Sequence, residues 1–472
     1  SIAPCDLLEI SAAGTPVART RVTARCLFLT LLNTLNALPA FLLFLGLCLL
    51  SATANAQTSN VGRRYPSEKR VLVDRLTGIP ITALTASPAM DLTLYQTHPQ
   101  WTSDGNYIIF RSNRTGNSKL RFGLSQVFAV DEVTGDIIQL TDGPGTITGT
   151  GALFVARKSM HFYYFRGSPG EPRQFIELNL DSLLSDSKAG AMKAAASYER
   201  VIMTIPDIMN DVGAFTLDAN ERFAYISGLA KDFPLENNRP AGTRPKAGVD
   251  GRQEAIWKID IQSGRLSRVI DVPLPIRIHH MQANPWVSGE IEYADGSSNA
   301  AQRTWLVNAD GSGNRPIYKE AEGEWVRHEV WVDADHMYFE VQKSDLLYLA
   351  KGEKVQSSAT RPTGIFSINV RTNEVKVLGQ LDREGAEGFE HCAGSSDGKW
   401  AVADTYRGEL YLINARTGEQ TLLSTGHKMK PDHTHPTFSP DNKRIVIQSG
   451  LLSDGKTLNI MTITIPLWLQ VK

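Results

Sequence analysis

This 472-residue chain repeats a short phrase, and histidine recurs at one position relative to that phrase. The residue three positions before the phrase is histidine in five of its seven copies: His98, His280, His328, His391 and His435. A single histidine that enters a strand is commonly a structural residue. Five at one repeat position, out of ten in the chain, favour a shared chemical role instead.

A further histidine, His433, stands two residues before His435. Alternate residues of a strand face the same side, so this His-Thr-His segment can present two imidazoles together. Neutral imidazole is the most common side-chain ligand of metals, and it also titrates near neutral pH. The pattern therefore predicts a metal site combined with a proton-transferring base.

The repeated phrase also predicts the elements that must position these histidines. Each copy begins with a strand, and most are followed by a strand, a tight turn and another strand, as in 127–141, 256–270 and 410–424. Thr-Gly, Ser-Gly and Asp-Gly pairs suit such turns, and the alternation of apolar residues around them marks strands. Four short antiparallel strands make one propeller blade, and blades must close on each other to bury their faces. The copies open at Trp101, Phe154, Phe215, Ala283, Trp331, Gly394 and Phe438.

We therefore predict an all-β fold, a seven-bladed β-propeller of four-stranded antiparallel blades, as a single domain over residues 57–472. The last blade lacks an outer strand, and the segment 74–85 matches the missing piece. We expect residues 79–84 to pair with the last blade and close the ring. The longest inserts are 181–210 and 228–253, and the proline, glycine and mixed charge of the second predict a loop.

Residues 1–56 are expected to be a signal peptide with an upstream segment. Three arginines precede an apolar stretch over 27–50, and Ala54-Asn55-Ala56 offers a cleavage site. Cleavage after Ala56 predicts a periplasmic or secreted protein with no stable membrane association. The net charge of −1 gives no electrostatic footprint for nucleic acid. The sequence has neither a Gly-x-Ser-x-Gly motif nor a phosphate-binding glycine-rich loop.

Several segments resemble the oligogalacturonate lyase family, which comprises seven-bladed propeller polysaccharide lyases that use manganese. The resemblance extends from about residue 74 to 466, and its HEVW and HTHP pieces are the most specific. It rests on QLTDGPG (139–145), HHMQANP (279–285), TWLVNADGSGN (304–314), RHEVWVDAD (327–335) and HTHPTFSPDNKRI (433–445).

The resemblance implies metal ligands at His328, His433 and His435 and a catalytic base at His280. The family's fourth ligand, a glutamine, corresponds here to a place near Lys430. We expect Mn²⁺ or another divalent ion at this site. Two histidines at the repeat position are assigned further roles: His98 as an additional ligand, and His391 in substrate binding with a reserve role as ligand.

The reaction implied is β-elimination, in which the C5 proton of a uronic acid is removed and 4,5-unsaturated uronates form. A cation must neutralise the carboxylate beside C5 as charge develops, and a neutral histidine can take the proton. Arg277 and Arg327 adjoin the histidine positions and could clamp that carboxylate, although a solvated loop charge explains them equally well. The predicted partner is thus an acidic oligosaccharide such as an oligogalacturonide of pectin.

Two alternatives remain open from the sequence. The protein could cleave another uronic-acid glycan, such as ulvan, by the same chemistry. It could also be a non-catalytic periplasmic binding propeller of the TolB type, in which similar Ser-Pro-Asp phrases occur. The aligned histidines favour an enzyme, because a binding scaffold needs no group of imidazoles at one repeat position.

Overall fold

The fold was analysed on a computed structural model of the chain. The predicted signal segment, 1–56, and residues 231–252 of the predicted loop lie outside the described residues. Those described are 59–116, 124–143, 145–149, 151–167, 172–206, 214–230, 253–273, 276–296, 300–343, 363–381 and 388–470. Among them, no helix has the length and apolar character needed to cross a membrane.

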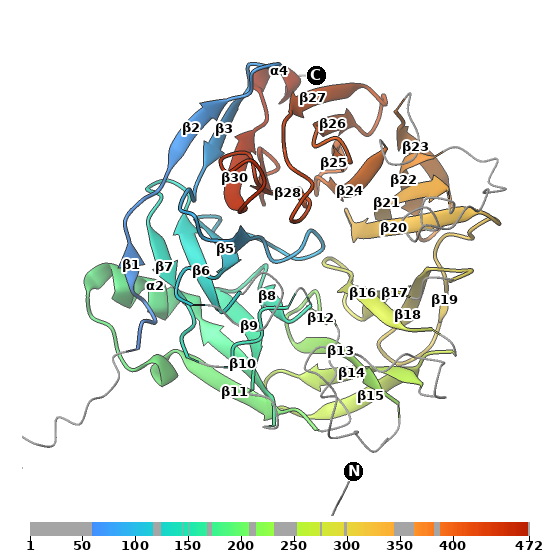
Figure 1. Cartoon of the computed structure of the whole chain (residues 1–472). Coiled ribbons are helices and arrows are strands. Elements are labelled where there is room, and N and C mark those ends of the chain that lie inside the picture. Colours follow the sequence, from blue (N-terminus) through green and yellow to red (C-terminus); the bar gives the residue numbers. More distant parts are fainter. Residues whose placement is uncertain are drawn as a thin grey trace, which may run out of the picture. The chain divides into compact units, whose positions relative to one another are not determined.

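The described residues form seven antiparallel sheets arranged around a central axis, which confirms the predicted seven-bladed propeller (Figure 1). Five sheets have four strands, as predicted, whereas the first and the last have five. Blade 1 contains β4 (Asp91–Leu92), β5 (Tyr107–Ser112), β6 (Gln126–Asp131) and β7 (Ile137–Gln139), with β1 (Arg64–Tyr65) added outside β7. Blade 7 contains β28 (Thr437–Phe438), β29 (Arg444–Ser449) and β30 (Asn459–Thr464), with β3 (Pro80–Ala83) and β2 (Arg70–Val73) added outside β30.

The remaining blades follow in chain order, each with its first strand nearest the axis (Figure 1). Blade 2 is β8 (Leu153–Val155), β9 (His161–Arg166), β10 (Gln174–Asn179) and β11 (Glu199–Thr204). Blade 3 is β12 (Phe215–Leu217), β13 (Phe223–Leu229), β14 (Glu254–Asp260) and β15 (Leu266–Asp271). Blade 4 is β16 (Ile278–Ala283), β17 (Glu290–Asp295), β18 (Thr304–Asn308) and β19 (Arg315–Pro316). Blade 5 is β20 (Glu324–Trp331), β21 (His336–Lys343), β22 (Gly364–Asn369) and β23 (Val375–Gly379). Blade 6 is β24 (Phe389–Gly394), β25 (Trp400–Thr405), β26 (Leu410–Asn414) and β27 (Gln420–Ser424).

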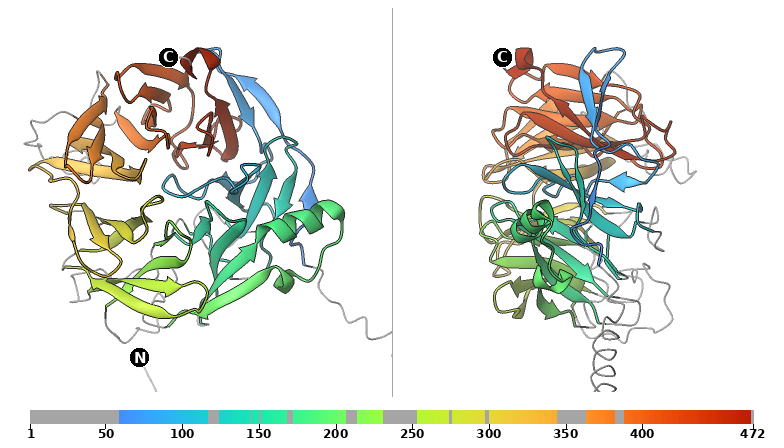
Figure 2. Two further views of the ribbon diagram at one scale, coloured as in Figure 1. Left: turned by 180° about the vertical axis from the view of Figure 1, so that it is seen from behind. Right: turned by 90° about the vertical axis from the view of Figure 1, so that its left-hand side faces the viewer.

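The insert 181–210 contains a helix and a strand. Helix α2 (Leu180–Ala189) begins at Asn179, whose side chain accepts a hydrogen bond from the Ser182 N–H, and ends at Gly190 with φ of 66°. Its apolar side buries Leu183 and Leu184 against blade 2, and it lies at the periphery of the ring (Figure 2). The short 3₁₀ helix η2 (Ala195–Ser197) then leads into β11. The described part of this insert, 181–206, therefore completes blade 2 at the outer edge of the ring.

The ring closes as predicted, through the N-terminal strand β3. It pairs antiparallel with β30, with Ile81 opposite Ile463 and Ala83 opposite Met461. Ile81, Ile463 and Met461 are fully buried in one apolar cluster, so closure is sealed by packing as well as by backbone hydrogen bonds. The outer strand β2 was not predicted, and its Val71 is 63% exposed.

Removing residues 57–90 should destabilise the whole propeller, because the edge of β30 then loses its partner strand. In the full chain, Ile81→Ala should cost about 2–5 kcal/mol, the usual cost of truncating a buried isoleucine. Val71→Ala is the matched control and should stay within about 0.5 kcal/mol because this side chain is exposed. Thermal or urea unfolding measures all three. A truncated protein that unfolds with an unchanged midpoint would contradict closure by β3.

Candidate active site

Five histidines from four blades meet at the propeller axis. The ring centroids of His328 and His391 are 4.0 Å apart, and His391 lies 4.3 Å from His435 and 4.9 Å from His433. His280 adjoins the group at 6.1 Å from His328. The structure thus brings together four of the five histidines at the repeat position, with His433 beside them. We call these five the histidine cluster.

A repeated irregularity of the inner strands aims these side chains. His280, His328 and His391 each lie within a register break of β16, β20 and β24, where two residues oppose one on the neighbouring strand. Such bulges redirect side chains and are enriched beside active sites. The backbone is left-handed at His280 (φ 33°), His328 (φ 52°) and His435 (φ 47°). Non-glycine residues adopt this conformation at a cost, which is most often retained at functional sites.

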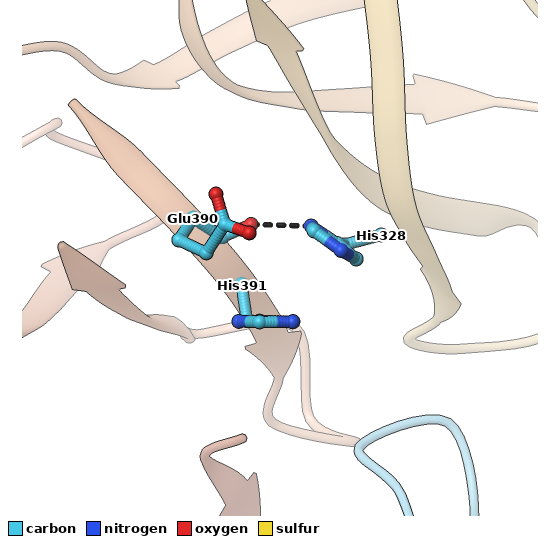
Figure 3. A group of neighbouring side chains, drawn as sticks. All are labelled: His328, Glu390 and His391. Atoms are coloured by element: carbon cyan, nitrogen blue, oxygen red, sulfur yellow. Dashed lines mark hydrogen bonds between the residues drawn. The ribbon is translucent and has the colours of Figure 1, made fainter. Parts of the chain in front are cut away.

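His328 is held by its Nδ1 atom. This nitrogen donates a hydrogen bond to the backbone carbonyl of Glu390 (Figure 3) and lies 3.1 Å from Oε2 of Glu340. Burial lowers the pKa of His328 well below its usual value and raises that of Glu340 well above it, which favours the neutral form of both side chains. With the Nδ1 proton directed to a carbonyl, Nε2 presents a lone pair, as in metal-ligating histidines.

The neighbours of His328 supply further donor atoms. Atoms of His328, Glu390 and His391 that could ligate a metal all lie within 4.8 Å of one another (Figure 3). Nδ1 of His391 and Nδ1 of His433 are buried without a hydrogen bond among the described residues, and they lie 3.4 Å from Oδ1 of Asp404 and 3.5 Å from Oε1 of Glu390, respectively. Imidazole nitrogens this close to a carboxylate are a donor set that suits a divalent transition metal. These residues therefore fit a metal ion.

His435 is hydrogen-bonded differently. Its Nδ1 lies 3.0 Å from Nε2 of Gln448, whose Oε1 accepts from the backbone N–H of Thr93 at 3.0 Å. That second bond fixes the amide orientation, so Gln448 donates to His435 and the proton of the neutral ring is on Nε2. A ligand role for Nε2 of His435 thus requires Gln448 to turn its amide. The predicted role of His435 stays a prediction.

His280 has the surroundings expected of a general base. Its Nε2 lies 3.1 Å from the Tyr95 hydroxyl, and its Nδ1 lies 3.1 Å from Nη2 of Arg303 and 3.4 Å from Oε1 of Glu329. Burial lowers the pKa of His280, and the nearby Glu329 carboxylate only partly opposes this. The ring is therefore neutral near pH 7, which is the state that can take a proton.

Three residues around His280 were not found from the sequence. Burial alone would raise the pKa of Glu329, but the guanidinium of Arg303, 3.2 Å away, and His280 hold it well below its usual range. Burial and the Glu329 charge raise the pKa of Tyr95, so its phenol stays protonated. Arg303 directly precedes the segment 304–314, which is a signal that could have identified it. Nothing in the sequence marks Tyr95, which reaches the axis on the segment between β4 and β5.

The two arginines predicted to clamp a carboxylate are placed otherwise. Arg327 forms a bidentate ion pair with Glu390, with Nη2 2.6 Å from Oε1 and Nη1 2.8 Å from Oε2. Its guanidinium also stacks over the Trp325 ring. It is thus committed to holding Glu390 beside the cluster. Arg277 binds Asp295 through its backbone N–H, and no contact joins its side chain to the histidines within the described residues. Arg303 is instead the guanidinium next to His280.

His98 does not join the histidine cluster. Blade 1 breaks its inner strand after β4, and His98 sits in a turn, with its backbone N–H bound to the Tyr95 carbonyl. Its Nδ1 lies 2.9 Å from the Thr97 hydroxyl, and its ring packs on Phe154. Lys430, at the place of the expected fourth ligand, is exposed. Among the described residues, Glu390 is the carboxylate that groups with His328 and His391 as a possible metal ligand.

In a regular strand His279 would point away from the channel, on the opposite side to His280. Its ring instead stacks on the His280 ring, 4.2 Å between centroids, although the residue is exposed. Neighbouring residues face opposite sides only in a regular strand, and the register break at His280 removes that alternation.

Acidification should destabilise the fold, because buried histidines resist protonation. Burial lowers the pKa of His427 to about 4, and both ring nitrogens contact serine hydroxyls, of Ser424 and Ser449. An unfolded histidine titrates near 6.5, so the unfolded state binds more protons below that pH and stability falls as the pH drops from about 6.5 toward 4. At pH 5 each such residue costs about 2 kcal/mol.

Thermal unfolding at pH 7 and pH 5 measures this loss. The variant His427→Gln keeps polar contacts to the serines but cannot titrate, so its stability should depend less steeply on pH. An identical pH dependence in both proteins would show that His427 does not contribute.

Known proteins with similar sequences are consistent with the site geometry described above. No family model matches the chain. An oligogalacturonide lyase of Pectobacterium atrosepticum is 23% identical over 428 residues, which cover 84% of this chain and 96% of the relative. An oligogalacturonate lyase of Dickeya dadantii is 23% identical over 439 residues, with the same coverage.

Two solved structures share the fold over most of their length. An oligogalacturonate lyase in complex with manganese superimposes with a TM-score of 0.66 at 18% identity, covering 87% of this chain and 99% of that one. An oligogalacturonate lyase from Vibrio parahaemolyticus gives a TM-score of 0.67 at 19% identity, covering 86% and 99%. The resemblance predicted from the sequence is confirmed in both sequence and fold.

Proposed function

We propose that this relative of the oligogalacturonate lyases is itself a lyase, which cleaves oligogalacturonides by metal-assisted β-elimination with His280 as base. One observation carries the proposal: a neutral histidine on β16 stands beside a separate group of histidines and Glu390 that fits a metal ion. Base and cation are the two parts that removal of a proton beside a carboxylate requires.

His280 would take the C5 proton. In this structure Nη2 of Arg303, which can only donate, lies 3.1 Å from Nδ1 of His280. Once Arg303 turns toward a substrate carboxylate, Nδ1 can carry the ring proton toward Glu329, 3.4 Å away, and Nε2 then presents its lone pair on the side where the Tyr95 hydroxyl lies at 3.1 Å. Glu329 then fixes the tautomer and stabilises the imidazolium that forms. Tyr95 marks the position that the C5–H group must approach, and its neutral phenol can donate a proton at that point.

Arg303 would bind the uronate carboxylate. Its guanidinium lies 3.1 Å from His280, so a carboxylate that it holds is next to the base. Glu329 shares the same guanidinium and keeps it oriented, since the Arg303 Nε atom lies 3.2 Å from Glu329 Oε2. A fixed guanidinium favours the geometry in which charge develops on the carboxylate.

His328, His391, His433 and Glu390 would hold the metal, with His435 available once Gln448 turns. A divalent ion such as Mn²⁺ would supply charge that neutralises the substrate carboxylate and makes the C5 proton more acidic. Arg327 and Glu340 act on this site indirectly, because they fix Glu390 and His328.

Incubating the purified protein with oligogalacturonides and Mn²⁺, and following the ultraviolet absorbance of the unsaturated product, tests the proposal. Oligosaccharides from ulvan serve as the parallel substrate, because they share the chemistry but not the sugar. Absorbance that rises only with ulvan fragments would reassign the substrate. No rise with either would favour a binding propeller.

We also propose that residues 57–472 act outside the cytoplasm after removal of residues 1–56. The basic, apolar and small-residue regions of that segment support export. Expression in a bacterial host, followed by mass measurement of the exported chain, should give a protein that begins at Gln57. A chain that keeps residues 1–56 would contradict cleavage.

A further inference from the structure

A cavity of about 420 Å³ lies in the channel, and none of the five clustered histidines lines it. The segment between β4 and β5 reaches the centre of the ring (Figure 1). Its Tyr95 contacts His280 and His435, whereas the adjacent Gln96 lines the cavity together with His98. The volume falls within the ~300–1,000 Å³ typical of small-molecule sites.

Unpaired polar atoms line this cavity. Gln96 is only 3% exposed, and neither atom of its amide has a hydrogen-bond partner within the described part of the chain. The same holds for Nε1 of Trp331 and Oγ1 of Thr437. Buried polar groups are normally hydrogen-bonded, and leaving them unpaired is costly. Together these atoms offer both donors and acceptors to a ligand.

Aromatic surfaces accompany the polar atoms. Trp101 and Trp331 line the cavity, and the indole of Trp101 is fixed by a 2.8 Å hydrogen bond to Glu132. Trp286 also lines it and is 42% exposed, so an aromatic face is presented to solvent. A sugar ring has the complementary chemistry, because its C–H faces stack on indole while its hydroxyls donate and accept hydrogen bonds.

The charged side chains that line the cavity indicate an acidic ligand. Arg157 and Lys158 line it and are exposed, and among the described residues neither side chain is hydrogen-bonded. The two carboxylates that line the cavity already accept hydrogen bonds within the protein. Asp218 accepts one from the Ser288 hydroxyl, and Glu221 accepts two from backbone N–H groups. Glu221 also attracts Arg157, but both cations are exposed at the edge of a polar, aromatic interior, where they can bind a sugar that carries a carboxylate.

We propose that this cavity is a second, non-catalytic binding site for a small acidic sugar, a uronic acid of one or two residues. The choice of a uronic acid rests on the proposed function, while the site itself rests on the cavity and its unpaired groups. Such a site would retain product or the end of a longer substrate beside the segment that carries Tyr95.

Titration calorimetry with galacturonic acid, combined with a crystal structure of the complex, tests the site in the full chain. Arg157→Gln and Trp331→Phe should each weaken binding by about tenfold, the worth of one hydrogen bond to a charged group or a buried donor. Lys399→Gln, which alters an exposed lysine away from the cavity, should bind as the unaltered protein does. Cleavage of oligogalacturonides should continue in all three variants.

The result that overturns the proposal is galacturonic acid at the histidine cluster alone, a cavity filled only by water, or unchanged binding in Arg157→Gln. Because Arg157 is exposed, that variant can be read even if Trp331→Phe fails to fold. The experiments distinguish failure of the sugar-binding cavity from failure of the proposed lyase activity. Sugar in the cavity of a protein that cleaves no oligogalacturonide supports this site and contradicts the lyase, and cleavage with an empty cavity does the reverse.

Discussion

Replacing His280 by alanine should lower turnover of oligogalacturonides by roughly 10²–10⁴-fold, the usual contribution of general-base catalysis. The substitution removes the neutral imidazole that lies beside Tyr95 and Arg303. It leaves the nitrogen and oxygen donors around His328 in place, so metal content and thermal stability should be retained. Steady-state kinetics, with metal analysis of the same preparation, measures both effects.

His279→Ala is the matched control, since this residue is adjacent in sequence and its ring stacks on His280. Loss of the stacked ring should reduce turnover far less than loss of the base. If His280→Ala keeps near-normal turnover, the base lies elsewhere, and Tyr95→Phe becomes the next variant to measure.

Replacing His328 by alanine should abolish Mn²⁺ binding and, with it, activity. Partners that only orient a ligand typically contribute 10–100-fold in metal affinity, so loss of the ligand itself should exceed about 100-fold. Glu340→Gln alters only the partner 3.1 Å from Nδ1 of His328 and should weaken binding by about 10–100-fold. Treatment with a chelator should likewise remove activity, and added Mn²⁺ should restore it.

Lys430→Ala is the control, because this exposed residue holds the place of the expected fourth ligand but contributes no donor beside the histidines. It should bind Mn²⁺ as the unaltered protein does. Calorimetry and elemental analysis distinguish the variants. Full metal content in His328→Ala would contradict the assignment of the metal site to the histidine cluster.

The fold was predictable because each blade repeats its own local signals. The turn pairs and the alternation of apolar residues recur in most copies, and the missing strand of blade 7 was visible at the N-terminus. The fifth strands of blades 1 and 7 were not predicted. β1 has two residues and pairs with the distant strand β7, and β2 pairs with β3, which itself joins blade 7 only through β30. Helix α2 was missed because its insert lies outside the repeat.

Only those site residues that occupy the repeated position could be predicted from the sequence. Histidines at one repeat position meet because equivalent positions converge at the axis, which places His280, His328, His391 and His435. His98 departs because blade 1 interrupts its inner strand. Arg327 was assigned to substrate because its pairing with Glu390 joins two blades and has no local signature. Bulges likewise depend on the partner strand, so their effect on His279 could not be read from the sequence.

The central claim is that the glycosidic bond breaks by elimination, which leaves the C4 oxygen on the departing sugar and adds no water. Cleavage of trigalacturonate in water enriched in heavy oxygen, followed by mass spectrometry of the products, tests this most directly. The account predicts an unsaturated fragment that is lighter than a hydrolysis product by one water, with no heavy oxygen incorporated at the cleaved bond. Saturated fragments that carry heavy oxygen there would show hydrolysis and contradict it.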